Sequence, residues 1–247
     1  MKGSSGWRRI PFIFSNSFAR SISESIFTSR VNRSSRMYKI CYKDKIIRLL
    51  HIDLNSHLPE SDDGYLKVLY PGKTKFLLNY VDKLEKSDKL RQLDILSTSP
   101  KKTKRDFAAI CKVVKAAGGL VINDDSEVLM IYRRGCWDLP KGKMEAKETK
   151  KQSAVREVKE ETGLRKVKML DKLATTYHMY RTQTSNRRVL KPTYWYLLSS
   201  NDLSVSPQTE EDIELVCWKK LDDETLASLT PIYSNIKDVI LAYKKML

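Results

Sequence analysis

Cysteine and histidine are scarce in this chain of 247 residues. The four cysteines, Cys41, Cys111, Cys136 and Cys217, lie far apart without a paired CxxC spacing, and there are only three histidines. Zinc sites and disulfide frameworks need such residues at short, regular spacings, so the sequence predicts neither. Isolated cysteines usually behave as small buried hydrophobes in a reducing compartment, which favours an intracellular protein.

Long apolar runs are also missing. The nearest candidate, Ile10 to Phe14, is interrupted by Ser15 and Asn16, whereas a helix that crosses a bilayer needs about 20 apolar residues. We therefore expect a soluble protein without a membrane partner.

Acidic residues are nearly absent from residues 1–36, where Glu24 is the only one among many serines and arginines. This composition is typical of an organelle transit peptide. The sequence predicts a disordered or targeting-like tail over residues 1–36. The predicted location is cytoplasmic, or mitochondrial or organellar if the tail is a genuine transit peptide.

Positive charge is abundant: 46 lysines and arginines against 30 acidic residues give a formal net charge of +16. Such a balance favours anionic partners, among them nucleotides, nucleic acid and anionic lipid. Because the basic residues are spread along the whole chain, a solvated lysine surface is an equally good interpretation. The composition gives no oligomeric state.

Residues 37–110 predict a small α/β domain of unknown role. Met37 opens a β-hairpin that turns at Lys43 and Asp44. Apolar residues recur at helical spacing from Phe76 to Leu84. Further elements are expected as strands at Leu66 to Tyr70 and Gln92 to Ser97 and a helix beginning at Pro100.

Residues 111–247 predict a second α/β domain with a mixed sheet between two helices. The expected strands are Val113 to Asn123, Glu127 to Arg133, Lys168 to Arg181, Pro192 to Ser199 and Glu214 to Lys219. The expected helices are Thr149 to Thr162 and Pro231 to Met246, the second with one apolar face.

Three carboxylates share one face of the first of these helices. Glu157, Glu160 and Glu161 stand at positions i, i+3 and i+4. Like charges so placed destabilise a helix by about a few tenths of a kcal/mol per pair, which a bound divalent cation would relieve. Ligands that are all oxygen favour Mg²⁺ or Mn²⁺.

The flanking residues have plausible supporting duties. Gly142 allows a tight loop before the helix, and Gly163 stands where a left-handed C-cap would end it. Arg156 could hold one of the three acids, or Glu148, through a bidentate pair.

The spacing of these residues resembles the complete Nudix box: Gly142, Glu148, Arg156-Glu157, Glu160-Glu161 and Gly163 with aliphatic Val158 and Leu164. The resemblance covers residues 142–164 closely and the stretch from about 113 to the C-terminus loosely. It implies a Nudix α/β/α sandwich. It also implies that Glu157, Glu160 and Glu161 hold a catalytic metal, with Glu148 and Arg156 supporting them. Nudix enzymes often draw a further acid from a distant loop, and Glu210 or Glu211 is the expected source.

Several other residues are candidates for binding the substrate. Cations flank the acidic face, and in a strand alternate aromatic residues present one face that could stack a base. The candidates are Arg133, Arg134, Lys141, Lys143, Tyr177, His178 and Tyr194. The Trp137–Gly142 stretch is similar to the Trp-x-x-Pro-Lys-Gly stretch of Nudix enzymes that act on dinucleoside polyphosphates and of decapping enzymes.

The leading hypothesis is hydrolysis of a dinucleoside polyphosphate or nucleoside triphosphate, with nucleic acid a partner that is not favoured. A second hypothesis is RNA decapping or inositol pyrophosphate cleavage, because the net charge of +16 is also compatible with these anionic substrates. A third makes the protein a nucleotide-sensing regulator whose residues 37–110 bind a partner or DNA. The intact acids of the box favour an enzyme over the regulator.

Overall fold

The computed structural model describes residues 37–53, 56, 61 and 63–247. These belong to one compact unit, Ser34–Leu247. The predicted tail, residues 1–36, lies outside the described residues. Within them no helix has the length and apolar character that crossing a membrane requires.

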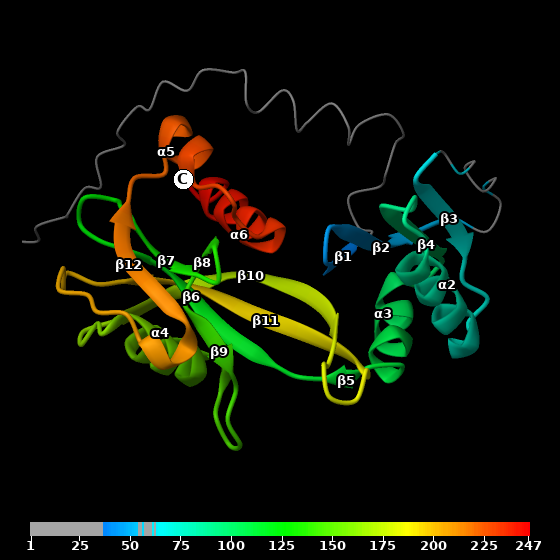
Figure 1. The fold of residues 1–247 in the computed structure, drawn as a ribbon, viewed down its shortest axis with the longest axis horizontal. Helices are drawn as coiled ribbons and strands as arrows, with labels where there is room; N and C mark the ends of the chain where they lie inside the picture. Colours follow the sequence, from blue (N-terminus) through cyan, green and yellow to red (C-terminus); the bar gives the residue numbers. More distant parts are fainter. Residues whose placement is uncertain (1–36, 54–55, 57–60, 62) are drawn as a thin grey trace, which may run out of the picture. The chain divides into compact units, whose positions relative to one another are not determined.

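A large mixed sheet joins the two predicted domains (Figure 1). Its main path runs β12-β7-β6-β11-β10-β1-β2-β4-β3, while β5, β8 and β9 pair with β11, β7 and β6. The strands are β1 (Tyr38–Tyr42), β2 (Lys45–His51), β3 (Tyr65–Leu69), β4 (Gln92–Ser97), β5 (Lys112–Val113), β6 (Ala116–Ile122), β7 (Val128–Arg133), β8 (Cys136–Asp138), β9 (Lys141–Lys143), β10 (Lys168–Arg181), β11 (Arg188–Ser199) and β12 (Ile213–Lys219). Strands from both sides of residue 110 belong to this one sheet. The division of the chain into two domains at residue 110 therefore stays a prediction.

The helices pack on both faces of this sheet (Figure 1). They are α2 (Thr74–Lys86), α3 (Pro100–Ala109), α4 (Lys150–Thr162), α5 (Asp223–Ser228) and α6 (Ser234–Lys244), with a short 3₁₀ turn η1 (Thr209–Glu211).

Alternation along the strands builds the sandwich around α4 and α6. In β11, Tyr196 and Leu198 pack with α4, whereas Trp195 and Leu197 pack with α6. Successive side chains of a strand point to opposite faces, so each strand supplies both cores at once. The predicted mixed α/β sandwich is thereby confirmed.

A separate hydrophobic core forms around the N-terminal elements, and two residues of the second predicted domain take part in it. Side chains of β1, β2, β4, α2 and α3 pack together with Met179 of β10 and Leu190 of β11. The link in the sheet is β1, which runs parallel to β10 and pairs Ile40 with Tyr177 and Cys41 with His178. Residues 37–110 therefore extend the sheet that carries the candidate site.

A buried ion cluster ties α2 to the β10–β11 hairpin. Glu85 accepts hydrogen bonds from Arg181 at 2.6 Å and from Arg188 at 2.6 Å, and Arg188 also contacts Asp82. The side chains of Glu85 and Arg188 are only 7% and 9% exposed. Burial acts to raise the pKa of Glu85, yet Arg188 and Arg181 together hold it below its ordinary value.

Most predicted elements lie where periodicity placed them. The strand expected from Val113 to Asn123 is divided into β5 and β6, and two other elements begin elsewhere. Strand β11 begins at Arg188, not Pro192, because the hairpin continues to the Arg181–Arg188 pair. Helix α6 begins at Ser234, not Pro231, because Pro231 and Ile232 lie along Trp137. The short elements β8, β9 and α5 were not predicted.

Candidate active site

Helix α4, which carries the three carboxylates, has both ends fixed by local contacts. Thr149 and Gln152 form a reciprocal capping box at its start. Gly163 ends it with φ of 72°, the left-handed conformation that glycine adopts without steric cost, as the sequence predicted. The helix therefore holds its carboxylates in one register against the sheet.

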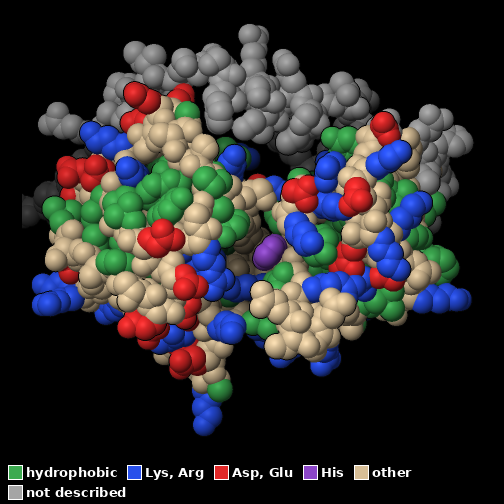
Figure 2. Space-filling view, viewed as in Figure 1, with side chains coloured by type: hydrophobic (Ala, Val, Ile, Leu, Met, Phe, Trp, Pro, Cys, Tyr) green, Lys and Arg blue, Asp and Glu red, His purple; other side chains and the backbone are tan. Residues whose placement is uncertain are grey.

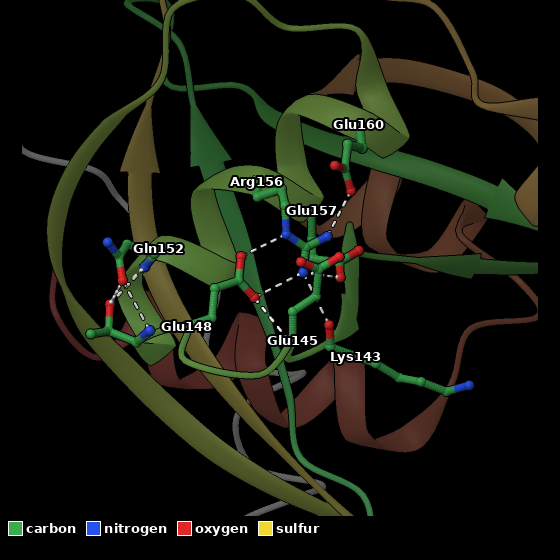
Figure 3. A network of polar contacts seen from close by, with 8 residues as sticks. Lys143, Glu145, Glu148, Gln152, Arg156, Glu157 and Glu160 are labelled. Atoms are coloured by element: carbon green, nitrogen blue, oxygen red, sulfur yellow. Dashed lines mark hydrogen bonds and ion pairs between the residues drawn. The ribbon is translucent and has the colours of Figure 1, made fainter.

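Arg156 joins three of the acids (Figure 3). It donates to Glu148 through Nε at 2.6 Å and Nη2 at 3.0 Å, which makes the pair bidentate. It also contacts Glu157 at 2.9 Å and Glu160 at 2.7 Å, and donates to the carbonyl of Lys143. The Arg156 guanidinium lowers the pKa of Glu148 to about 2. One cation thus fixes the loop before α4 and the carboxylates on it.

Two of the three helix carboxylates are buried against strand β9. Glu161 is 2% exposed and accepts from the backbone N–H of Lys141 at 2.8 Å and from Arg133 at 3.4 Å. Burial raises the pKa of Glu161 to about 7, and burial also raises the pKa of Glu157. Glu160 is about half exposed. The protein therefore buries more negative charge on this face than its own cations stabilise.

The expected duty of Gly142 was wrong. This residue does not form a loop but lies in β9, paired with Ala117 of β6. A Cβ at position 142 would overlap the carboxylate oxygens of Glu157. Glycine is needed because that carboxylate packs directly on the backbone.

Substituting Gly142→Ala should consequently displace the Glu157 carboxylate. A shift on the order of 1 Å in a reacting group can lower activity about 10²-fold, and we expect a loss of that size in kcat/KM. Hydrolysis assays together with thermal unfolding measure both consequences. A variant that keeps wild-type kcat/KM would show that the Glu157 position is unimportant.

The buried Glu161 predicts a pH dependence of stability in metal-free protein. Its pKa rises from 4.5 in the unfolded chain to about 7 on folding, so the folded state binds this proton more tightly. The free energy of unfolding should then fall as pH rises from about 4.5 to about 7, by roughly 3 kcal/mol, and level off above it.

This dependence is measurable by urea unfolding in EDTA between pH 4.5 and 8. Glu161→Gln cannot ionise, so the difference between wild type and variant isolates the contribution of Glu161. Parallel pH profiles for the two proteins would contradict the raised pKa.

The residues on this face suit a hard divalent cation by their chemistry. Glu157, Glu160 and Glu161 offer only carboxylate oxygens, which Mg²⁺ and Mn²⁺ prefer, and two of them are buried with raised pKa values. In the described part of the chain no group of three His, Cys, Asp or Glu side chains already stands at metal-binding distances. Arg156 holds Glu157 and Glu160 instead.

The structure separates the two candidates for a further acid. Both belong to η1 and are exposed, and the charge of Glu211 is near enough to raise the pKa of Glu157. Arg134 forms an ion pair with Asp212 at 2.7 Å, next to Glu211. Arg134 therefore lies where it can hold this turn, and Glu211 is the better candidate.

A second cluster of charges lies beside Glu161. Lys141 forms a 2.6 Å ion pair with buried Asp138, and His178 pairs in register with Lys191 across β10 and β11. Burial and the neighbouring Lys141 lower the pKa of Lys191 to about 8. Burial, Lys191 and Lys141 lower the pKa of His178. Among the described residues, neither His178 nor Lys191 has a hydrogen-bond partner for its side chain.

The remaining substrate candidates lie apart from these groups. Tyr177 packs against Tyr38, with ring centroids 6.1 Å apart, and Lys150 lies 3.9 Å from the ring centroid of Tyr194. Figure 3 shows the Lys143 side chain extending away from the carboxylates. Arg133 and Lys141 therefore reach the acidic face through Glu161, and the charge of Lys141 reaches His178. The contacts of Tyr177, Tyr194 and Lys143 are with other residues.

Sequence reasoning missed Asp138 as a member of the site. It noted Lys191 only because Lys191-Pro192-Thr193 resembles the entry to the substrate-side strand in dinucleoside polyphosphate hydrolases. Asp138 stands inside the Trp137–Gly142 stretch, three residues before Lys141, so that stretch held the available signal. Lys191 becomes a neighbour of His178 only through the strand register. Figure 2 shows basic side chains mixed with acidic ones around a hollow, not one continuous basic patch.

Comparisons with known proteins identify the family. The NUDIX domain model matches residues 112–240, more than half of the chain. A Mycobacterium tuberculosis protein provisionally named mutator protein MutT4 is 39% identical over 116 residues, which cover 42% of this chain and 44% of that relative. The chain thus spans less than half the length of this relative.

Two solved structures are similar at lower identity. A MutT protein from Methanosarcina mazei Go1 is 20% identical, covering 55% of this chain and 96% of that one with a TM-score of 0.42. A C. elegans Ap4A hydrolase is also 20% identical, covering 54% and 96% with a TM-score of 0.42. The family assignment rests on the domain model alone.

The chain belongs to the Nudix hydrolase family. This family generally uses divalent cations and acts on nucleotide-type small molecules.

Proposed function

We propose that this protein is a Mg²⁺-dependent hydrolase of phosphoanhydride bonds, acting on a dinucleoside polyphosphate or a nucleoside triphosphate. The observation that carries the proposal is the pairing of two buried carboxylates of raised pKa, Glu157 and Glu161, with the cluster of Lys141, His178 and Lys191 beside them. The first group calls for a cation, and the second for an anion. A phosphate chain with its metal satisfies both.

Each residue has a duty that follows from its contacts. Glu157, Glu160 and Glu161 would hold Mg²⁺, which when bound supplies charge neutralisation and an activated water. Arg156 and Glu148 orient these acids. Glu211, exposed and close to Glu157, is the candidate to take the proton of the attacking water.

The phosphate chain itself is assigned to the cations. Lys141 and Lys191 present ammonium groups, and His178, whose pKa is lowered, presents a neutral ring that can donate one hydrogen bond. Arg133 already donates to Glu161 and lies at the junction of the two clusters. Phosphate oxygens that bind here would lie within reach of the acidic face.

The test is a substrate panel with Mg²⁺: diadenosine tetraphosphate, the nucleoside triphosphates and ADP-ribose. Lys191→Met should raise KM for the preferred substrate about tenfold or more, because a charge-assisted contact to phosphate is lost. Lys168→Met, an exposed lysine of β10, is the control. If wild type hydrolyses nothing in the panel, the substrate assignment fails.

A hollow of about 780 Å³ beside α4 favours a second candidate, a larger polyanion such as an inositol pyrophosphate or capped RNA. Its lining includes Lys147, Lys151 and Lys159 as well as Glu160. Inhibition of hydrolysis by single-stranded RNA or inositol hexakisphosphate, lost in Lys151→Gln/Lys159→Gln, would favour this candidate.

A further inference from the structure

A second recess lies where the N-terminal elements meet β10, apart from the carboxylates of α4. Its volume is about 500 Å³, and its walls come from β1, α3, β10 and α6. The charged or aromatic side chains in it are Tyr38, Lys39, Lys104, Lys172, Tyr177 and Asp238. We call it the β1–β10 recess. Recesses of a few hundred Å³ are the usual size for small-molecule sites.

The β1–β10 recess carries an excess of positive charge. Its single carboxylate, Asp238, lies 2.8 and 2.9 Å from the ammonium of Lys39, so these two residues neutralise one another. The ammonium groups of Lys104 and Lys172 form no ion pair with a carboxylate among the described residues, and Lys172 contacts Asp171 only through its backbone N–H. Two lysine charges are therefore left to attract an anion, and a phosphate monoester carries close to two negative charges at pH 7.

Lys104 is held in place by the aromatic residues. Its ammonium lies 4.4 Å from the ring centroid of Tyr38 and 5.4 Å from that of Tyr177, and it donates to the Tyr177 hydroxyl at 3.3 Å. Cation–π contacts fix the position of an ammonium without neutralising its charge. One of its three N–H groups is used in this way, and two remain for a ligand.

The N-terminal elements are essential to this arrangement. Tyr38 and Lys39 come from β1 and Lys104 from α3, whereas the other wall comes from β10 and α6 of the Nudix part. The parallel pairing of β1 with β10 brings the two walls together. None of the acids of α4 and none of Lys141, His178 and Lys191 lines this recess.

We propose that the β1–β10 recess is a second, non-catalytic site that binds a small phosphate monoester through Lys104 and Lys172. This gives residues 37–110 a role, since they supply half of the site. The ligand must carry a dianionic phosphate and be small enough to enter the recess. A nucleoside monophosphate is one such compound.

Binding of AMP and of inorganic phosphate to the full chain, measured by isothermal titration calorimetry in EDTA, tests the proposal. EDTA removes divalent cations, so binding through a metal at the acidic face is suppressed while the lysines are unaffected. Binding to Lys141, His178 and Lys191 would be recognised because Lys104→Gln/Lys172→Gln would leave it unchanged. Lys104→Gln/Lys172→Gln should weaken binding of both probes about tenfold or more. The matched control Lys101→Gln/Lys168→Gln changes exposed lysines of the same helix and strand and should bind as wild type does.

Two outcomes would overturn the proposal. One is equal affinity of wild type and the Lys104→Gln/Lys172→Gln variant. The other is no binding of either probe to wild type at millimolar concentrations. Because hydrolysis with Mg²⁺ is assayed separately, either outcome leaves the proposed catalytic function standing.

Discussion

Replacing Glu157 or Glu160 by glutamine is expected to lower the rate of hydrolysis about 10²- to 10⁴-fold while the protein stays folded. Each substitution removes a negative charge that the bound cation would need and leaves the side-chain volume almost unchanged. Glu160 is about half exposed, so its loss should hardly affect packing. The measurement is kcat/KM with Mg²⁺, with thermal unfolding as the check on folding.

The control for this prediction is Glu145→Gln. Glu145 is exposed and lies in the loop before α4. It contacts Glu148 through its backbone, with its N–H donating to the Glu148 carboxylate at 3.0 Å and its carbonyl accepting from the Glu148 N–H at 3.3 Å. Its substitution should leave kcat/KM near the wild-type value. Full activity in both Glu157→Gln and Glu160→Gln would remove the acidic face of α4 from the catalytic machinery.

The largest expected effect on stability comes from Glu85. Glu85→Ala would leave Arg181 and Arg188 without the carboxylate that they share, and Arg188 is buried. Breaking a buried ion pair by removing one partner costs about 3–5 kcal/mol, because a buried charge remains uncompensated. Urea unfolding at neutral pH measures this loss.

Lys86→Ala is the matched control, since Lys86 is exposed and neighbours Glu85 in α2. It should change the free energy of unfolding by less than about 0.5 kcal/mol. The lowered pKa of Glu85 adds a pH signature: the stability it contributes is present above its ordinary pKa and is lost as pH falls through the folded value. A loss below about 1 kcal/mol in Glu85→Ala would show that the ion cluster does not hold α2 to the hairpin.

Local signals in the sequence predicted α4 and its surroundings well. The acids recur at helical spacing, and Gly163 ends the helix as expected, whereas the capping box of Thr149 and Gln152 was first seen in the structure. Capping and periodicity act between residues that are neighbours in the sequence, so the sequence displays them directly. The strands β10 and β11 were predicted for the same reason, but their pairing as a hairpin was not.

Contacts between distant segments account for what was missed. Gly142 was assigned to a loop because its pairing with Ala117 and its closeness to Glu157 are not visible in the local sequence. Lys191 joins His178 through the strand register. The aromatic side chain of Tyr177 indicated substrate stacking, but the parallel pairing of β1 places it in the β1–β10 recess instead. Register and parallel pairing join residues across long loops, which composition cannot reveal.

The central claim is that the acidic face of α4 uses a divalent cation to cleave a phosphoanhydride bond. The most direct measurement is release of nucleotide products from diadenosine tetraphosphate and from nucleoside triphosphates by wild-type protein, with Mg²⁺ and with EDTA, alongside Glu160→Gln with Mg²⁺. We predict products only from wild type with Mg²⁺. Equal product formation in EDTA, or by Glu160→Gln with Mg²⁺, would contradict the account.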